Sequence, residues 1–230
     1  MVMRVTQKEL RQKMTKEKLA VTIWNYNGGV GKTTISLILS QIAARQGLNV
    51  LAIDLDEQRN LSETLKLSKH NFPSITVHTE LKPAYHDNNY DFFVIDTHPS
   101  KDETVKSAMQ FADIVLVPIL TDYLSIINLR SVFDYVKSCG VGEGQIAVVK
   151  NSVTEFKVSE EIEQELDEQG YTAAGRLPRS NILVRNIANG DSWDKFMRPN
   201  QREPFARLYA RVWKAFMRML AGEFHNIWRD

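Results

Sequence analysis

The segment that most constrains this sequence is a glycine-rich stretch between an apolar run and a helical pattern. It reads Asn27-Gly28-Gly29-Val30-Gly31-Lys32-Thr33-Thr34. The apolar run at 19–24 predicts a buried strand before it, and apolar residues at helical spacing over 35–43 predict a helix after it. Glycines let the backbone bend so that successive N–H groups converge on an anion, and the N-terminus of the following helix adds its partial positive charge. This context predicts a phosphate-binding loop rather than an accidental glycine-rich turn.

Apolar runs and helical patterns alternate along the rest of the chain. Further strands are predicted at 50–53, 75–77, 90–96, 114–119 and 146–149. Helical patterns are predicted at about 102–112, 124–138 and 157–169, with two more helical stretches closing the chain. This alternation predicts an α/β fold, a doubly wound, mostly parallel sheet with helices on both faces.

Length and composition limit the other possibilities. The 230 residues suffice for one sizeable domain, and we expect a single domain over 19–230. Residues 1–18 are polar and basic and predict an N-terminal arm or short helix, either solvated or in contact with a partner. The net charge of +1 gives no overall bias toward nucleic acid or membrane, so such a partner must bind a local patch. The single cysteine, Cys139, excludes an intrachain disulfide and predicts a cytoplasmic protein, and no apolar run is long enough to span a bilayer.

Acidic residues follow two of the predicted strands. Asp54 and Asp56 come directly after the strand at 50–53, and Asp96 ends the strand at 90–96. The carboxyl ends of parallel strands form the edge at which such sheets bind ligands. One aspartate in this position could equally be a helix cap. Together with the glycine-rich loop, however, these carboxylates predict a phosphoryl-transfer site.

Four segments resemble motifs of the ParA/MinD family of ATPases. Gly28–Thr33 resembles its deviant phosphate-binding loop, with Tyr26 where the general pattern has glycine. Asp54–Asn60 resembles the family's D-x-D-P-Q-x-N motif, with Glu57 in place of proline, and the segment 95–100 resembles its Walker B segment, usually D-x-P-P-S, with His98 in place of the first proline. Leu177–Ser180 resembles a late loop of the partition branch, so the likeness runs from residue 19 to about 220.

The resemblance implies a role for each matching residue. ATP would be bound by the loop residues Asn27, Gly28, Gly29, Val30, Gly31, Lys32, Thr33 and Thr34. Lys32 would contact the β- and γ-phosphates, and Asp56 would orient the attacking water; these two are the predicted catalytic residues. Mg²⁺ would be held by Thr33 and Asp96, with Asp54 supporting its shell.

Asn27 is the most informative departure from the family pattern. Most members have a lysine at this position, which crosses an ATP-bound dimer to the partner's phosphates. A cation supplied in trans accelerates comparable reactions by about 10³–10⁵, and asparagine cannot supply one. Either hydrolysis is slow or another cation substitutes. Lys150, just after the strand at 146–149, is the first candidate unless it is only a surface lysine, and Arg179 and Arg185 follow.

The C-terminal stretch 204–220 predicts an amphipathic helix with Pro204 in its first turn. Its apolar stripe comprises Phe205, Leu208, Tyr209, Val212, Trp213, Phe216 and Leu220. Its basic residues, with one from the late loop, are candidates for contacts with DNA phosphates: Arg179, Arg207, Arg211, Lys214 and Arg218. The alternatives are a helix packed on the sheet with a solvated basic face, or a helix lying on a membrane, as the MinD branch suggests.

These features favour a partition or positioning ATPase that dimerises on ATP, binds DNA non-specifically and is nucleoid-associated. A ParB-like or other small adaptor would stimulate hydrolysis, and plasmid DNA is the first expected cargo. The alternatives are a carboxysome- or other cargo-positioning ATPase, which also resembles this chain in lacking the loop lysine, and a membrane-associated MinD-like regulator. A metabolic ligase or small-molecule kinase on the same fold would need a second substrate pocket, for which the sequence shows no motif.

Overall fold

We describe the protein from a computed structural model, which describes residues 18–82, 89–122, 125, 127–153, 164–168, 170–223 and 227–228. The predicted N-terminal arm therefore lies outside the described residues, apart from Lys18. The helix predicted at 157–169 is described only over 164–168, and this part is helical.

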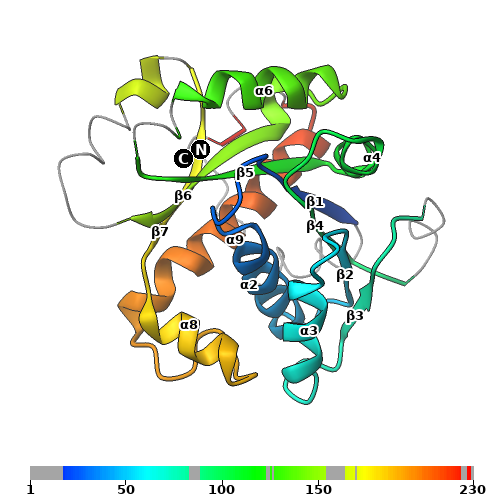
Figure 1. Cartoon of the computed structure of the whole chain (residues 1–230), viewed down its shortest axis with the longest axis vertical. Helices are drawn as coiled ribbons and strands as arrows, with labels where there is room; N and C mark the ends of the chain where they lie inside the picture. The colour runs from blue at the N-terminus through cyan, green and yellow to red at the C-terminus, as the bar shows by residue number, and fades with distance from the viewer. Residues whose placement is uncertain are drawn as a thin grey trace.

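A seven-stranded sheet forms the centre of the molecule, and all of its strand pairs are parallel (Figure 1). The strand order is β3-β2-β4-β1-β5-β6-β7. The strands are β1 (Leu19–Ile23), β2 (Val50–Asp54), β3 (Ile75–His78), β4 (Phe92–Asp96), β5 (Ile114–Leu120), β6 (Ile146–Val153) and β7 (Ala173–Pro178). The predicted doubly wound fold is confirmed, and so are all six strands expected from the apolar runs.

Helices cover both faces of the sheet (Figure 1). They are α2 (Lys32–Arg45), α3 (Asn60–Leu67), α4 (Glu103–Phe111), α6 (Leu129–Ser138), α8 (Asn181–Ala188) and α9 (Pro199–Leu220), with a 3₁₀ turn η2 (Glu143–Gln145). Side chains of α2, α3 and α9 share one core with one face of the strands, and those of α4 and α6 share another with the opposite face. Every residue of β1, β2 and β4 is buried. Burial on both faces explains why these strands are continuous apolar runs without alternation.

The strand order places a topological switch point beside β1. β1 lies between β4 and β5, and the chain leaves β1 for α2 on one face and leaves β4 for α4 on the other. In open α/β sheets, ligands bind where consecutive connections diverge in this way, at the carboxyl ends of the strands. The loop after β1 and the acidic ends of β2 and β4 therefore meet at one edge.

Three parts of the fold differ from the predictions. Helix α3 was not among the predicted helices, and β7 was not predicted as a strand because its Ala-Ala-Gly-Arg sequence has low β-propensity. The last helix begins at Pro199, so Pro204 lies inside it rather than in its first turn. Pro199 takes the first helical position, where a missing N–H costs nothing. At the other end, Leu220 is 50% exposed and lies outside the apolar stripe that packs on the sheet.

Candidate functional site

The glycine-rich loop between β1 and α2 leaves a helix N-terminus open. Gly29 and Gly31 have left-handed φ angles of 72° and 98°, a conformation that side chains oppose. Gly31 occupies the N-cap position of α2, with no side chain capping the helix and no acidic residue in its first turn. The first N–H groups of α2 are therefore available to an anion, with the positive end of the helix dipole behind them.

Asn25, which the sequence analysis did not single out, anchors the start of the loop. Its buried amide donates to the carbonyl of Pro118 at 2.9 Å, and its Oδ1 accepts from the backbone N–H of Asn27 at 2.9 Å. These two bonds tie the loop to the end of β5. The loop is thus held by the sheet on the N-terminal side of its glycines.

Lys32 is folded back over the loop. Its Nζ donates to the carbonyl oxygen of Asn27 at 2.9 Å, and the residue is 7% exposed. Burial lowers the pKa of Lys32, and the charges of Asp96 and Asp56 oppose that change. The ammonium group therefore lies inside the loop, on the side of the two carboxylates, and gains from any phosphate placed there.

Asp96 at the end of β4 carries a buried oxygen without a partner. Its Oδ1 accepts from the hydroxyl of Ser36 at 3.1 Å, whereas its Oδ2 has no hydrogen-bond partner among the described residues. Burial, together with the neighbouring charge of Asp54, raises the pKa of Asp96 to about 7, against the nearby hydroxyls of Thr33 and Ser36, which favour the carboxylate. Ser36 was missed by the sequence analysis, although its position one turn after Thr33 is a signal that could have found it.

This arrangement fits a hard cation such as Mg²⁺. An unpaired buried carboxylate oxygen beside the Thr33 hydroxyl offers two oxygen ligands. Within the described part of the chain no three His, Cys, Asp or Glu side chains converge as a metal site. The protein alone therefore supplies few ligands, as is usual where Mg²⁺ is also bound by phosphates and water.

Asp54 shapes the segment that carries Asp56. Asp54 is fully buried and pairs in register with Asp96. Its Oδ1 accepts from the N–H of Asp56 at 3.2 Å and its Oδ2 from the N–H of Ser62 at 2.8 Å, in the first turn of α3. Both oxygens are thus occupied by the backbone, and the contacts describe an anchor for the loop rather than a metal ligand. Asp56 itself is half-buried and accepts from the N–H of Gln58 at 2.9 Å.

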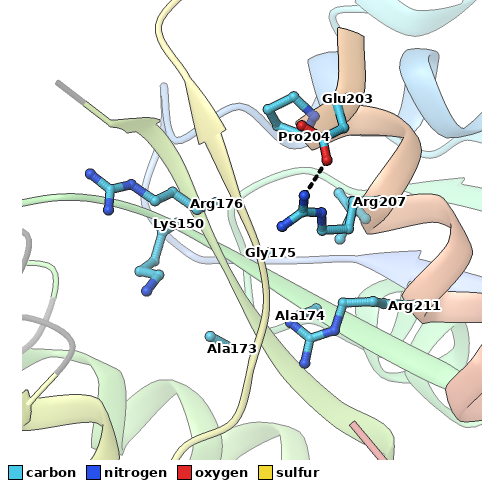
Figure 2. Close-up of a pocket in the computed structure, with 10 residues that line it drawn as sticks. Lys150, Ala173, Ala174, Gly175, Arg176, Glu203, Pro204, Arg207 and Arg211 are labelled. Carbon is cyan, nitrogen blue, oxygen red and sulfur yellow. Dashed lines mark hydrogen bonds and ion pairs between the residues drawn. The ribbon is translucent and has the colours of Figure 1, made fainter. Parts of the chain in front are cut away.

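The structure brings Asn151, not Lys150, to the glycine-rich loop. The Asn151 amide donates to the carbonyl of Val30 at 2.9 Å. Because side chains alternate along a strand, Lys150 projects from the opposite face of β6. It lines a groove of about 330 Å³ beside the edge strand β7, where it pairs in register with Arg176 (Figure 2). The prediction that Lys150 follows its strand into the nucleotide site therefore has no support in these contacts.

Comparison with protein-family models matches residues 21–193 to the CobQ/CobB/MinD/ParA nucleotide-binding domain. The chain belongs to this family. The chromosome-partitioning ATPase Soj of Thermus thermophilus is 24% identical over 241 aligned positions, which cover 88% of this chain and 95% of Soj.

Two solved structures share the fold. MinD of Pyrococcus horikoshii, complexed with Mg-ADP, has a TM-score of 0.69 at 18% identity and covers 91% of this chain and 99% of MinD. An ATP complex of a variant of McdA from Cyanothece has a TM-score of 0.68 at 17% identity and covers 84% of this chain and 96% of McdA. The ParA/MinD family of partition and positioning ATPases, indicated by the motifs, is thereby confirmed, and nucleotide binding is the general property of its shared domain.

The apolar face of α9 packs on the sheet instead of facing outward. The apolar stripe is buried in the core, where Trp213 stacks on Phe92 with ring centroids 5.8 Å apart. The stripe is therefore not available to a membrane, and within the described residues no helix is long and apolar enough to cross one. The membrane alternative loses the feature on which it rested.

The arginines of α9 are largely engaged within the molecule. Arg207 forms an ion pair with Glu203 (Figure 2), and Arg211 donates to the carbonyl of Trp228. Arg218 donates to the carbonyl of Ile227 at 3.1 Å. These bonds fasten the buried tail residues 227–228 along α9. Of the predicted DNA contacts, Arg179, Arg207 and Lys214 are exposed, whereas Arg211 and Arg218 bind the tail at 227–228, a structural role that the sequence pattern did not reveal.

Proposed function

We propose that this chain is an ATPase that binds ATP with Mg²⁺, dimerises on ATP, binds DNA without sequence preference and segregates or positions a cargo. A small partner protein would stimulate hydrolysis, and plasmid DNA is the first candidate cargo. The observation that supports this proposal best is the open N-terminus of α2 beside the unpartnered Asp96 oxygen. The named activity of Soj and the Mg-ADP held by MinD point in the same direction.

Each residue has a task in this proposal. The N–H groups of the loop and of α2 would bind the phosphates, while Thr33 and Asp96 would hold Mg²⁺, which neutralises phosphate charge when bound. Lys32 would exchange the Asn27 carbonyl for a phosphate oxygen, a favourable exchange because a buried ammonium gains most from a full negative charge. Asp56 would orient the attacking water.

Slow turnover by the isolated protein is part of the proposal. The Asn27 side chain is neutral, and its backbone carbonyl serves as the acceptor for Lys32. No other cation is brought to the loop by the described contacts, and Arg185 lies over the ring of Phe196 at 5.4 Å. Arg179 is exposed just beyond the carboxyl end of β7, so it is the remaining candidate from the sequence. We therefore expect the stimulating partner to supply, or to order, the missing positive charge.

DNA binding would be weak for one protomer and would gain from assembly. Exposed Arg179 and Lys214 supply phosphate contacts, and non-specific affinities of about 10⁻⁴–10⁻⁶ M are usual. A nucleotide-assembled dimer doubles the contacts, so ATP can control DNA binding through avidity alone.

The test compares wild type, Lys32→Ala and the surface control Lys66→Ala. Nucleotide affinity is measured with a fluorescent ATP analogue, and self-association by analytical ultracentrifugation with and without ATP and Mg²⁺. We expect Lys32→Ala to lose both, and Lys66→Ala, whose lysine pairs with Glu63 on the surface, to retain both. Equal affinity and association in all three proteins would refute the proposal. Loss of DNA association on raising salt at constant ATP tests the DNA-binding step.

A further inference from the structure

His98 stands where the family pattern has proline, and its ring makes two contacts. Nδ1 lies 3.1 Å from the carbonyl oxygen of Leu55, and Nε2 lies 2.5 Å from Oδ2 of Asp102. Burial would raise the pKa of Asp102, but hydrogen bonds from Ser100, the Val105 N–H and His98 hold it below its usual range. Asp102 is therefore a carboxylate. A carbonyl oxygen and a carboxylate are hydrogen-bond acceptors, so each ring nitrogen of His98 faces an acceptor, one on either side of the ring.

The bond to Leu55 adds a rung to the sheet. The Leu55 N–H donates to the Asp96 carbonyl at 2.9 Å, which continues the β2–β4 ladder one step beyond Asp54. In a parallel ladder the next rung would run from the N–H of residue 98 to the carbonyl of Leu55. The imidazole Nδ1 occupies that place. A proline at position 98 has no backbone N–H and no side-chain donor, so this rung depends on the histidine.

The anchored carbonyl lies directly before Asp56. The preceding carbonyl, that of Asp54, accepts from the Arg59 guanidinium, so two consecutive carbonyls are held by side chains. The Asp56 N–H is held in turn by the Asp54 carboxylate. A cleft of about 570 Å³ separates this loop from the start of α4, and the His98 ring is bonded to both of its walls, through Leu55 on one side and Asp102 on the other.

We propose that His98 is a positioning residue that clamps the Asp56 loop, residues 54–59, to the segment after β4, so that Asp56 and Asp96 keep a fixed relative position. The clamp itself is a property of the nucleotide-free protein. Its consequence for hydrolysis rests on the function proposed above. The two parts are therefore tested by different measurements.

Hydrogen exchange of the nucleotide-free protein tests the clamp. His98→Ala removes both contacts, whereas His98→Asn places an amide N–H where Nδ1 was and keeps only the bond to Leu55. Ser107→Ala, an exposed residue that lines the same cleft, is the control. We expect exchange in a peptide covering 54–60 to accelerate about tenfold in His98→Ala and to stay near wild type in the other two. Exchange in β5 shows whether the whole fold has been destabilised.

Steady-state kinetics test the consequence. We expect His98→Ala to lower kcat about tenfold with the KM for ATP within about twofold, because the loop at 27–34 binds the nucleotide. His98→Asn should recover most of the loss. Unchanged exchange at 54–60 in His98→Ala would overturn the clamp, and accelerated exchange with an unchanged kcat would overturn its part in hydrolysis. Absence of any turnover in wild type would refute the proposed function, and the exchange result would still decide the clamp.

Discussion

Asp96 and Asp54 make a matched pair with opposite expected effects on stability. Both are fully buried, and they pair in register at the ends of β4 and β2. Both Asp54 oxygens accept backbone N–H groups, whereas Oδ2 of Asp96 has no partner among the described residues. Replacing Asp54 by asparagine therefore removes a carboxylate whose two oxygens are both hydrogen-bonded. Replacing Asp96 removes a carboxylate with one oxygen that lacks a partner among the described residues.

The magnitude for Asp96→Asn follows from its pKa. Burial raises that pKa from 3.8 to about 7. The pKa of Asp96 is higher in the folded state than in the unfolded state, so the group favours the native state fully only below pH 3.8. This contribution to stability is lost as the pH rises through about 7. At about 1.4 kcal/mol per pH unit, the loss approaches an upper bound of roughly 4 kcal/mol at pH 8. Asparagine cannot ionise, so Asp96→Asn should regain much of this energy.

The assay is urea unfolding without nucleotide or Mg²⁺ between pH 5 and 8.5. We expect Asp96→Asn to be more stable than wild type at pH 8, with the difference shrinking toward pH 5. Asp54→Asn should be destabilised by about 1–3 kcal/mol, because an amide N–H₂ then faces a backbone N–H. Adding ATP and Mg²⁺ should stabilise wild type more than Asp96→Asn. An Asp96→Asn protein less stable than wild type at pH 8, or a difference that does not vary with pH, would refute the reasoning.

Three further predictions concern the loop and the last helix. Gly31→Ala places a Cβ against Nδ2 of Asn151, at a left-handed φ that alanine disfavours. The free energy of unfolding should therefore fall by about 2 kcal/mol, and binding of a fluorescent ATP analogue should weaken. Adding Asn151→Ala removes the clash and should restore part of the stability. Arg211→Ala should lower the free energy of unfolding in urea by about 1–2 kcal/mol, because the bond to the Trp228 carbonyl is lost. Lys214 is exposed, so Lys214→Ala should change the free energy of unfolding little and should instead weaken DNA retention at low salt. In the same unfolding assay, Trp213→Ala should lower the free energy of unfolding by about 3–5 kcal/mol because Trp213 is buried, and Leu220→Ala should lower it by less than about 0.5 kcal/mol because Leu220 is half-exposed. Equal losses in the two variants would contradict the packing of α9 on the sheet.

Much of the site could be predicted because its residues lie in short, local motifs. The loop at 27–34 needs only its own glycines and the strand and helix beside it. The aspartates at 54, 56 and 96 follow apolar runs whose burial on both faces makes them recognisable. Helix α3 and strand β7 were missed because their residues show no strong hydrophobic pattern. Which of Lys150 and Asn151 reaches the glycine-rich loop depends on the face of β6 that each side chain occupies, which neighbouring residues do not reveal.

The sequence by itself determined the six strands with clear apolar runs, the phosphate-binding loop and the acidic strand ends, because each is encoded by neighbouring residues. The tertiary structure alone decided which side chains meet. Asn151 reaches Val30 from 121 residues away, His98 closes on Leu55, and the arginines of α9 hold the tail at 227–228. Strand register and side-chain alternation set these contacts, and both arise from packing between segments that are distant along the chain.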